Sequence, residues 1–151
     1  MGVMVQKYQK ILVPVDGSEN AEKSLERAIA IAKRNGAHLD ILNVIDVKHF
    51  ASNIGGVIDP TGDIIYSTFE NVQSYLKELE QKVFEAGHKD VSVHARFGSP
   101  RMIISKEFPD EYNSDLIIIS KTGLNPVERI LMGAVTDYVV RMARCDVMVV
   151  R

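Results

Sequence analysis

The chain has 151 residues, of which 46% are apolar and 25% are charged, and its formal net charge at pH 7 is −2. This length and composition predict one globular domain over residues 1–151 with a single substantial core. Acidic and basic side chains are nearly balanced, so no excess of Lys and Arg is left to neutralise a phosphate backbone. We therefore expect no nucleic-acid partner.

Cysteine content and apolar runs bear on the cellular setting. Cys145 is the only cysteine, so it cannot form an intrachain disulfide. No apolar run reaches the length of a membrane span, and none has the pattern of a secretory signal. We expect a reducing, cytoplasmic setting and no membrane association.

The first part of the chain predicts a strand, a helix, a second strand and a long loop. The apolar run 11–15 is typical of a buried strand, and it ends in an Asp-Gly-Ser turn that can cap a helix. Apolar residues then recur at helical spacing over 19–35, with acidic residues in the first turn and Gly36 after the last. Residues 39–45 predict a second strand. Residues 46–63 hold three Gly and one Pro without a clear period, which predicts a loop.

The middle of the chain predicts a helix, an edge strand and another helix. Apolar residues over 69–83 alternate spacings of three and four, and Gly87 closes this amphipathic helix. Residues 91–97 alternate apolar and polar side chains, as expected where one face meets solvent, so we expect an edge strand. The third helix begins at Pro100 and buries a stripe that includes Ile103, Ile104 and Phe108.

The last part predicts a central strand, a helix and a final strand. The uninterrupted apolar run 116–119 is typical of a central parallel strand, the stripe over 135–142 of a helix, and the run 147–150 of a fifth strand. Alternating strands and helices predict an α/β fold with a doubly wound, Rossmann-like parallel sheet of order 3-2-1-4-5 and helices on both faces. Ligands of such sheets bind beyond the carboxyl ends of the strands, here after strands one, two and four.

The segment after the fourth strand could bind an anion. Ser120-Lys121-Thr122-Gly123 is followed by nine residues, Gly133, and Ala134-Val135-Thr136 at the start of the last helix. The first N–H groups of a helix lack intrahelical partners, and glycine lets a phosphate approach the backbone closely. Alternatively, Gly123 is a turn residue and Gly133 merely precedes a helix; the spacing does not decide between these interpretations.

This segment resembles the signature of the universal stress protein family: a glycine, two residues, a second glycine, nine residues, a third glycine and a Ser or Thr. Three other stretches match the same family, namely ILVPVDGS at 11–18, NVID at 43–46 and CDVMVVR at 145–151. The resemblance covers nearly the whole chain. It implies a stress protein that binds an adenine nucleotide, with ATP, ADP or AMP as ligand and Mg²⁺ as a companion of the nucleotide.

The resemblance also implies roles for single residues. In ATP-binding members the glycine loop holds the phosphates and the aspartate after strand one lies beside the nucleoside, roles that fall here on Gly123, Gly133 and Asp16. Val44 would contact the adenine through its backbone. Chemistry alone leaves Asp16 a purely local role, binding neighbouring backbone N–H groups. The full set of expected nucleotide-binding residues is Pro14, Val15, Asp16, Val44, Ser120, Gly123, Arg129, Gly133, Ala134, Val135 and Thr136.

Two positions depart from the signature. Ser120 replaces the first glycine, which costs on the order of 1 kcal/mol if φ must be positive there. Ala134 replaces the signature hydroxyl and removes a phosphate hydrogen bond of about 1 kcal/mol. Ser120 and Thr136 keep hydroxyls near the expected phosphate, and Lys121 or Arg129 could add charge or be solvated loop residues. An interaction module that has lost nucleotide binding is therefore an alternative function.

Nothing in the sequence predicts catalysis. The loop lacks the Gly-Lys-Ser/Thr end of a P-loop, and no general base accompanies it. The histidines, at positions 38, 49, 88 and 94, lack metal-ligand spacing, and we interpret them as surface or strand-edge residues. Cys145 is expected to pack as a small apolar residue. We assign no catalytic residue and no metal site, with a weak ATP phosphohydrolase as a second alternative.

The final strand suggests a second copy as partner. If residues 147–150 form an edge strand, their apolar side chains come with unpaired backbone groups, a condition that soluble proteins usually avoid. Pairing with the same strand of another copy would cover them symmetrically. The family resemblance also implies a homodimer through this strand.

Overall fold

The sheet has the predicted order. The computed structural model describes residues 7–46, 62–123 and 132–151, and within them parallel strands form one sheet in the order β3-β2-β1-β4-β5. The strands are β1 (Lys10–Pro14), β2 (His38–Ile45), β3 (Val91–Phe97), β4 (Leu116–Ser120) and β5 (Asp146–Val150). The predicted edge positions of β3 and β5 are confirmed.

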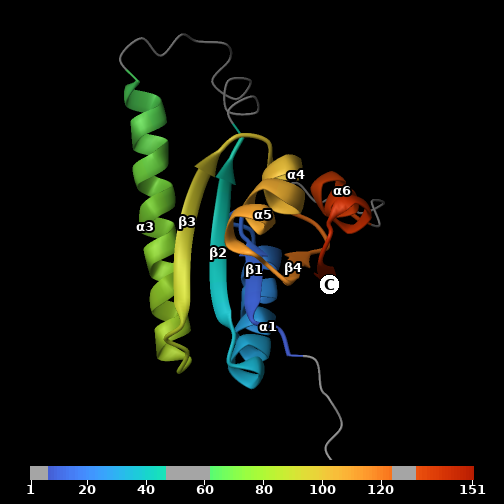
Figure 1. The fold of residues 1–151 in the computed structure, drawn as a ribbon. Coiled ribbons are helices and arrows are strands. Elements are labelled where there is room, and N and C mark those ends of the chain that lie inside the picture. The colour runs from blue at the N-terminus through green and yellow to red at the C-terminus, as the bar shows by residue number, and fades with distance from the viewer. Residues whose placement is uncertain (1–6, 47–61, 124–131) are drawn as a thin grey trace, which may run out of the picture.

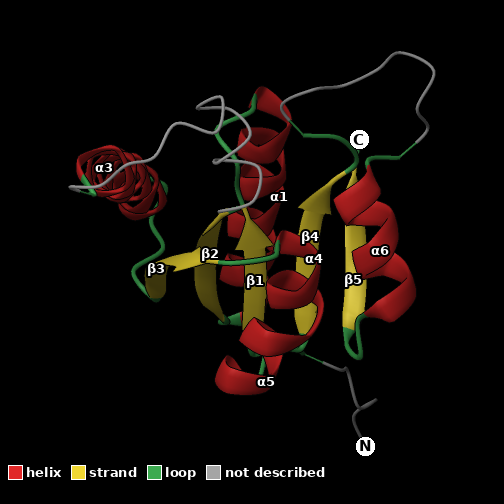
Figure 2. Cartoon of the chain, turned by 90° about the horizontal axis from the view of Figure 1, so that it is seen from above, coloured by secondary structure: helices red, strands yellow, loops and turns green. Residues whose placement is uncertain are grey.

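Two helices cover one face of the sheet (Figures 1 and 2). These are α1 (Glu19–Asn35) and α3 (Asp63–Glu85). The Ser18 side chain caps α1 by accepting a hydrogen bond from the Ala21 N–H at 3.1 Å, and Gly36 ends it in the left-handed conformation at φ 62°. Residues of α1 and α3 pack on alternate side chains of the strands, and this layer contains the larger core cluster.

The opposite face is covered by a segmented helix and by α6 (Ala134–Met142) (Figure 2). The segmented helix consists of α4 (Pro100–Met102), a π-helical turn η1 (Ile103–Glu107) and α5 (Phe108–Tyr112). In the π turn the Phe108 N–H donates to the Ile103 carbonyl. The wider turn precedes Pro109, which has no N–H and whose ring would collide with a carbonyl four residues earlier in a regular helix.

A buried carboxylate joins three strands beneath α5. Asp40 on β2 is 1% exposed, and its oxygens lie 3.1 Å from Lys10 Nζ on β1, 3.1 Å from His38 Nε2 and 2.9 Å from His94 Nε2 on β3. Burial alone would raise the pKa of Asp40, but hydrogen bonds from His94 and Lys10 and the positive charges beside it hold the pKa below its ordinary value. The cluster therefore keeps Asp40 ionised within the sheet.

Some details differ from the sequence-based expectations. Helix α3 begins at Asp63, six residues before the first position of its apolar stripe at Phe69. Its first turn is partly exposed, with Tyr66 at 63%, so no periodic signal marks its start. His88 is buried at 8%, and its Nε2 lies 2.9 Å from the Ala37 carbonyl oxygen, so the surface interpretation of this histidine is wrong. Most of the predicted loop 46–63 and His49 lie outside the described residues.

The fold brings the ends of β1 and β4 together. Along the chain the sheet grows from β1 through β2 to β3, and the segmented helix then returns the chain to β4 on the other side of β1. The winding therefore reverses between β1 and β4, the position at which such sheets bind ligands. No helix in the three described ranges has both the length and the apolar character needed to cross a bilayer.

Candidate functional site

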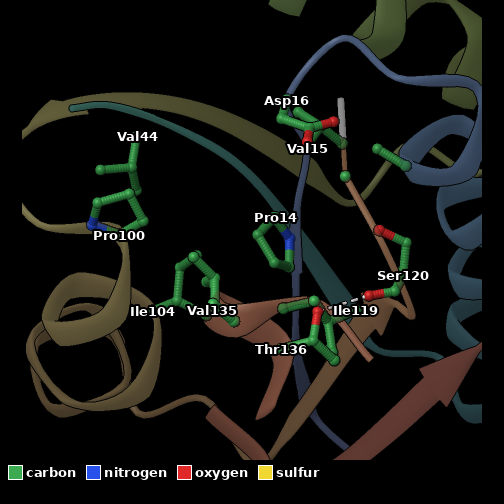
Figure 3. Close-up of a pocket in the computed structure, with 14 residues that line it drawn as sticks. Pro14, Val15, Asp16, Val44, Pro100, Ile104, Ile119, Ser120, Val135 and Thr136 are labelled. Atoms are coloured by element: carbon green, nitrogen blue, oxygen red, sulfur yellow. Dashed lines mark hydrogen bonds between the residues drawn. The ribbon is translucent and has the colours of Figure 1, made fainter. Parts of the chain in front are cut away.

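A cavity lies at the carboxyl edge of the sheet where the winding reverses (Figure 3). Its volume is about 500 Å³, within the range of small-molecule sites. It is lined by Pro14, Val15, Asp16, Ala21, Val44, Pro100, Ile104, Ile119, Ser120, Gly123, Gly133, Ala134, Val135 and Thr136. The wall is mostly apolar, with polar groups at its rim and at the start of α6.

The structure gathers the sequence-predicted residues around this one cavity, except Arg129, which lies outside the described residues. Four lining residues were not predicted: Ala21, Pro100, Ile104 and Ile119. Each is a small or apolar residue that the sequence marks only as core or as a helix start, so no chemical signal distinguishes it. Ile119, near the carboxyl end of the predicted fourth strand, is the one whose position in the sequence hinted at the site.

Asp16 stands where β1 leaves the sheet. The Val15 N–H donates to the Leu42 carbonyl at 2.8 Å, which is the last bond of β1 to β2. The exposed Asp16 carboxylate lines the cavity, while its Oδ1 accepts a hydrogen bond from the Ser18 N–H at 3.0 Å. Asp16 thus has the local bonding role that its sequence context indicates, and its other oxygen remains at the cavity rim.

The backbone of Val44 lies past the end of β1. In a parallel pair, alternate residues direct both N–H and C=O to the same neighbour, and the bonds at His38 and Leu42 show that even-numbered residues of β2 face β1. The β1 register ends at Pro14, opposite Leu42. The next pair of groups, those of Val44, therefore has no partner on β1 and lies at the cavity, offering one donor and one acceptor.

The end of β4 is held by two hydroxyls. Thr136 Oγ1 donates to the Ser120 carbonyl oxygen at 2.7 Å, and Ser120 Oγ donates to the Thr122 carbonyl oxygen at 3.0 Å. Asn113 is the non-glycine residue with positive φ in the described ranges, so Ser120 is not in the conformation that would demand glycine. The strain expected from replacing the signature glycine is absent.

The two signature glycines differ in their surroundings. A Cβ on Gly123 would lie 2.5 Å from Asp16 Oδ2, a distance that forces a shift. A Cβ on Gly133 would lie 3.4 Å from the Lys121 carbonyl oxygen, close to ordinary contact. Gly133 has φ −64° and ψ 154°, which any residue can adopt. Gly123 is therefore fixed by a close approach, whereas the fold itself makes no such demand on Gly133.

Helix α6 directs its first turn at the cavity. Gly133 is its N-cap, and the Asp137 N–H makes the first backbone bond of the helix, to the Gly133 carbonyl at 2.9 Å. The N–H groups of Ala134 and Val135 precede that bond, so they have no intrahelical acceptor. With the helix dipole, they make the α6 end of the cavity attractive to an anion.

Ionisable groups are scarce in the cavity. Among the described lining residues Asp16 is the one ionisable side chain. Nowhere in the described ranges do three or more His, Cys, Asp or Glu side chains form a group suited to a metal ion. Cys145 is half-buried against the α6 side of the core, and burial raises the pKa of its thiol, which favours the unreactive protonated form.

Comparisons with known proteins agree on one family. The model of the Universal stress protein family matches residues 7–151. A protein of Staphylococcus aureus strain USA300 that carries the universal stress protein name is 41% identical over 149 residues, covering 95% of this chain and 84% of its own. The solved structure of UspA from Lactobacillus plantarum has a TM-score of 0.80 at 28% identity, with 97% of this chain and 100% of that chain covered.

A further solved structure is described as a universal stress protein in complex with cAMP. Its TM-score is 0.70 at 26% identity, and the likeness covers 97% of this chain and 98% of that chain.

Proposed function

The chain belongs to the universal stress protein family, and on that premise we propose that it binds an adenine nucleotide in the cavity at the carboxyl edge of the sheet. ATP is the proposed ligand, and ADP and AMP are the alternatives. Mg²⁺ would bind together with the nucleotide. The protein acts in the cytoplasm by nucleotide-dependent interaction with partners rather than by turnover.

The observation that supports this proposal is that one apolar cavity has two different sets of polar backbone groups, one at Val44 and one at the start of α6. At one end the Val44 backbone offers a donor and an acceptor side by side, which complements the N1 acceptor and N6 amino donor of adenine. At the other end the free N–H groups of α6 suit a phosphate. Between them, Pro14, Ile104 and Val135 supply an apolar wall for the base and sugar.

Asp16 is the proposed partner of the ribose. A carboxylate repels phosphate but accepts hydrogen bonds from hydroxyls, and Asp16 lines the same cavity as Val44 and the start of α6. The solved relative in complex with cAMP supports an adenine nucleotide as ligand class. Base selection follows from the backbone at Val44, because guanine presents a donor and an acceptor in the opposite order.

Titration calorimetry with ATP and with GTP tests the proposal. ATP should bind with a saturable heat, and GTP should bind at least about tenfold more weakly because its base leaves the Val44 groups mismatched. Equal binding of the two nucleotides would overturn the assignment of the base site. Absence of binding by both would favour the alternative of an interaction module that has lost its nucleotide.

That alternative and the enzymatic one have their own tests. If the departures from the signature abolished binding, the double substitution Ser120→Gly and Ala134→Ser should create ATP affinity that the parent lacks.

If the protein were a phosphohydrolase, it should release many phosphates per chain. We propose that it does not release phosphate in this way, because Asp16, the one ionisable side chain among the described lining residues, is assigned to the ribose.

A second copy of the chain is the proposed partner at β5. This strand is the exposed edge of the sheet next to β4, and its residues Val147, Met148 and Val149 are half-buried. Pairing of β5 with its counterpart would satisfy the outward backbone groups and cover these side chains.

A further inference from the structure

Two hydroxyls at the phosphate end of the cavity already have acceptors. Thr136 is 5% exposed and Ser120 7% exposed, and Figure 3 shows the bond from Thr136 to the Ser120 carbonyl. Each hydroxyl has a single proton. The proton of Thr136 is donated to Ser120 and that of Ser120 to Thr122, so neither is available to a ligand.

We propose that Ser120 and Thr136 are positioning residues, which hold α6 and the chain after β4 so that the backbone N–H groups at the start of α6, and not these two hydroxyls, donate to the phosphate. This inference rests on the proposed function, and it specifies how that site recognises its ligand. The ligand group that meets these N–H groups must be a hydrogen-bond acceptor, as phosphate oxygens are.

The bonds around the start of α6 support this role. The Thr136 bond ties the third residue of α6 to the last residue of β4, and the Gly133 N–H donates to the Lys121 carbonyl at 2.8 Å. The Lys121 N–H in turn donates to the Val150 carbonyl at 2.8 Å. The start of the helix is therefore fixed at two points to a strand end that is itself held by β5.

Because Thr136 is buried, loss of its hydroxyl should change the direction of the N–H groups at the start of α6. The N–H groups of Ala134 and Val135 keep their direction only while the first turn of α6 stays against β4. Without the hydroxyl, the Ser120 carbonyl loses its side-chain donor in a buried place, which favours a shift of the turn. A bound phosphate would then meet misdirected N–H groups.

The same geometry gives Ser120 a role that the family glycine could not fill. The Ser120 hydroxyl folds the chain back onto Thr122, and Thr122 Oγ1 accepts a hydrogen bond from Asn20 Nδ2 at 2.8 Å. These bonds connect β4, the chain after it and α1. The substitution Ser120→Gly would remove the bond from Ser120 to Thr122, so it should weaken ATP binding. The alternative in which nucleotide binding has been lost predicts that the same substitution strengthens ATP binding.

The test compares Thr136→Val with Thr136→Ser in the full chain, using ATP as probe. Thr136→Val keeps the shape and loses the donor, and we expect about tenfold weaker ATP binding by calorimetry from the lost bond and the turn it directs. Thr136→Ser keeps the donor and should bind within about twofold of the parent. Equal affinity of the parent and Thr136→Val would overturn the positioning role.

A measurement without ligand separates this inference from the proposed function. Amide hydrogen exchange of Gly133 and Asp137 reports the two backbone bonds at the start of α6. It should quicken in Thr136→Val and stay unchanged in Thr136→Ser, even if the parent binds no ATP. Unchanged exchange in Thr136→Val would refute the inference, and a general rise throughout the chain would show loss of the fold and refute it equally.

Discussion

The carboxylate of Asp16 lies against Gly123, so that a Cβ on the glycine would come within 2.5 Å of Asp16 Oδ2. The contact joins the chain leaving β1 to the chain leaving β4, across the point where the winding of the sheet reverses. It explains a signature glycine by a side chain far away in sequence, and it places the proposed ribose partner next to the proposed phosphate loop.

Alanine at the two glycines should therefore have unequal effects. Gly123→Ala must displace the exposed Asp16 carboxylate and strain the bond that it accepts from the Ser18 N–H, which should cost about 1.5 kcal/mol of unfolding free energy. Gly133→Ala meets only near-ordinary contacts and should cost less than about 1 kcal/mol, the loss of a modest N-cap. Urea unfolding of both variants without ligand gives the comparison, and a larger loss at Gly133 would contradict it.

Loss of the buried Asp40 charge should lower the unfolding free energy more than loss of an exposed carboxylate does. Asp40→Asn leaves Lys10, His38 and His94 without their shared charge and should lower the unfolding free energy by about 3 kcal/mol at pH 7. Asp90→Asn is the matched control, because Asp90 contacts His38 at 2.6 Å but is 62% exposed, and it should cost less than about 1 kcal/mol.

The pH dependence of that difference has a definite sign. The folded pKa of Asp40 lies below its ordinary value of 3.8, so the carboxylate stabilises the fold fully above that value. The stabilisation disappears as the pH falls through the folded pKa. The gap between the parent and Asp40→Asn should be present above pH 3.8 and close as the pH falls below that value. A gap that stays fully open well below pH 3.8 while the protein remains folded would contradict the assignment.

Tyr75 on α3 should titrate well above the ordinary pKa of tyrosine. Burial of its hydroxyl, followed by the negative charges of Glu22 and Asp16, raises the pKa of Tyr75 to about 12. An absorbance titration should show one tyrosine ionising near that pH, and Tyr75→Phe should remove this step. Because the folded pKa is raised, the stabilisation is present below the ordinary pKa of 10 and lost as the pH rises through 12. If Tyr75→Phe removed a step near pH 10 instead, the hydroxyl would not be buried as described.

A proline on β5 tests the proposed homodimer. The Val150 carbonyl accepts from Lys121 on the β4 side, so by alternation the Val149 N–H faces outward. Val149→Pro removes that outward donor and spares the ladder to β4, and it should give a folded monomer in sedimentation velocity. Met148→Pro, the control, removes an inward donor and should lower the unfolding temperature. A Val149→Pro variant with the parent's association constant would exclude pairing through β5.

The sequence could predict the strands, their order and most of the site because these follow from local patterns. Apolar runs mark β1 and β4, and the glycine signature marks the segment that meets them. It could not predict partners that depend on distance in space. The Asp40 cluster joins residues of three strands, and the Thr136 hydroxyl turns to Ser120 rather than into the cavity.

Two other features were also hidden from the sequence pattern. The π turn before Pro109 keeps the helical apolar spacing nearly intact, so periodicity does not reveal it. The cavity wall formed by Ile104 and Ile119 consists of side chains that look like core in sequence and become a site only because β1 and β4 end beside them. In each case residue type is readable from the sequence, whereas the neighbour across the sheet is not.

Backbone amide shifts during an ATP titration test the central claim most directly. Binding in the cavity should move the resonances of Val44, Ala134 and Val135 together, with one saturation curve and with Asp16 and Gly123 following. ATP that produces no saturable shifts, or shifts gathered on residues away from the carboxyl edge of the sheet, would contradict the assignment of this cavity as the nucleotide site.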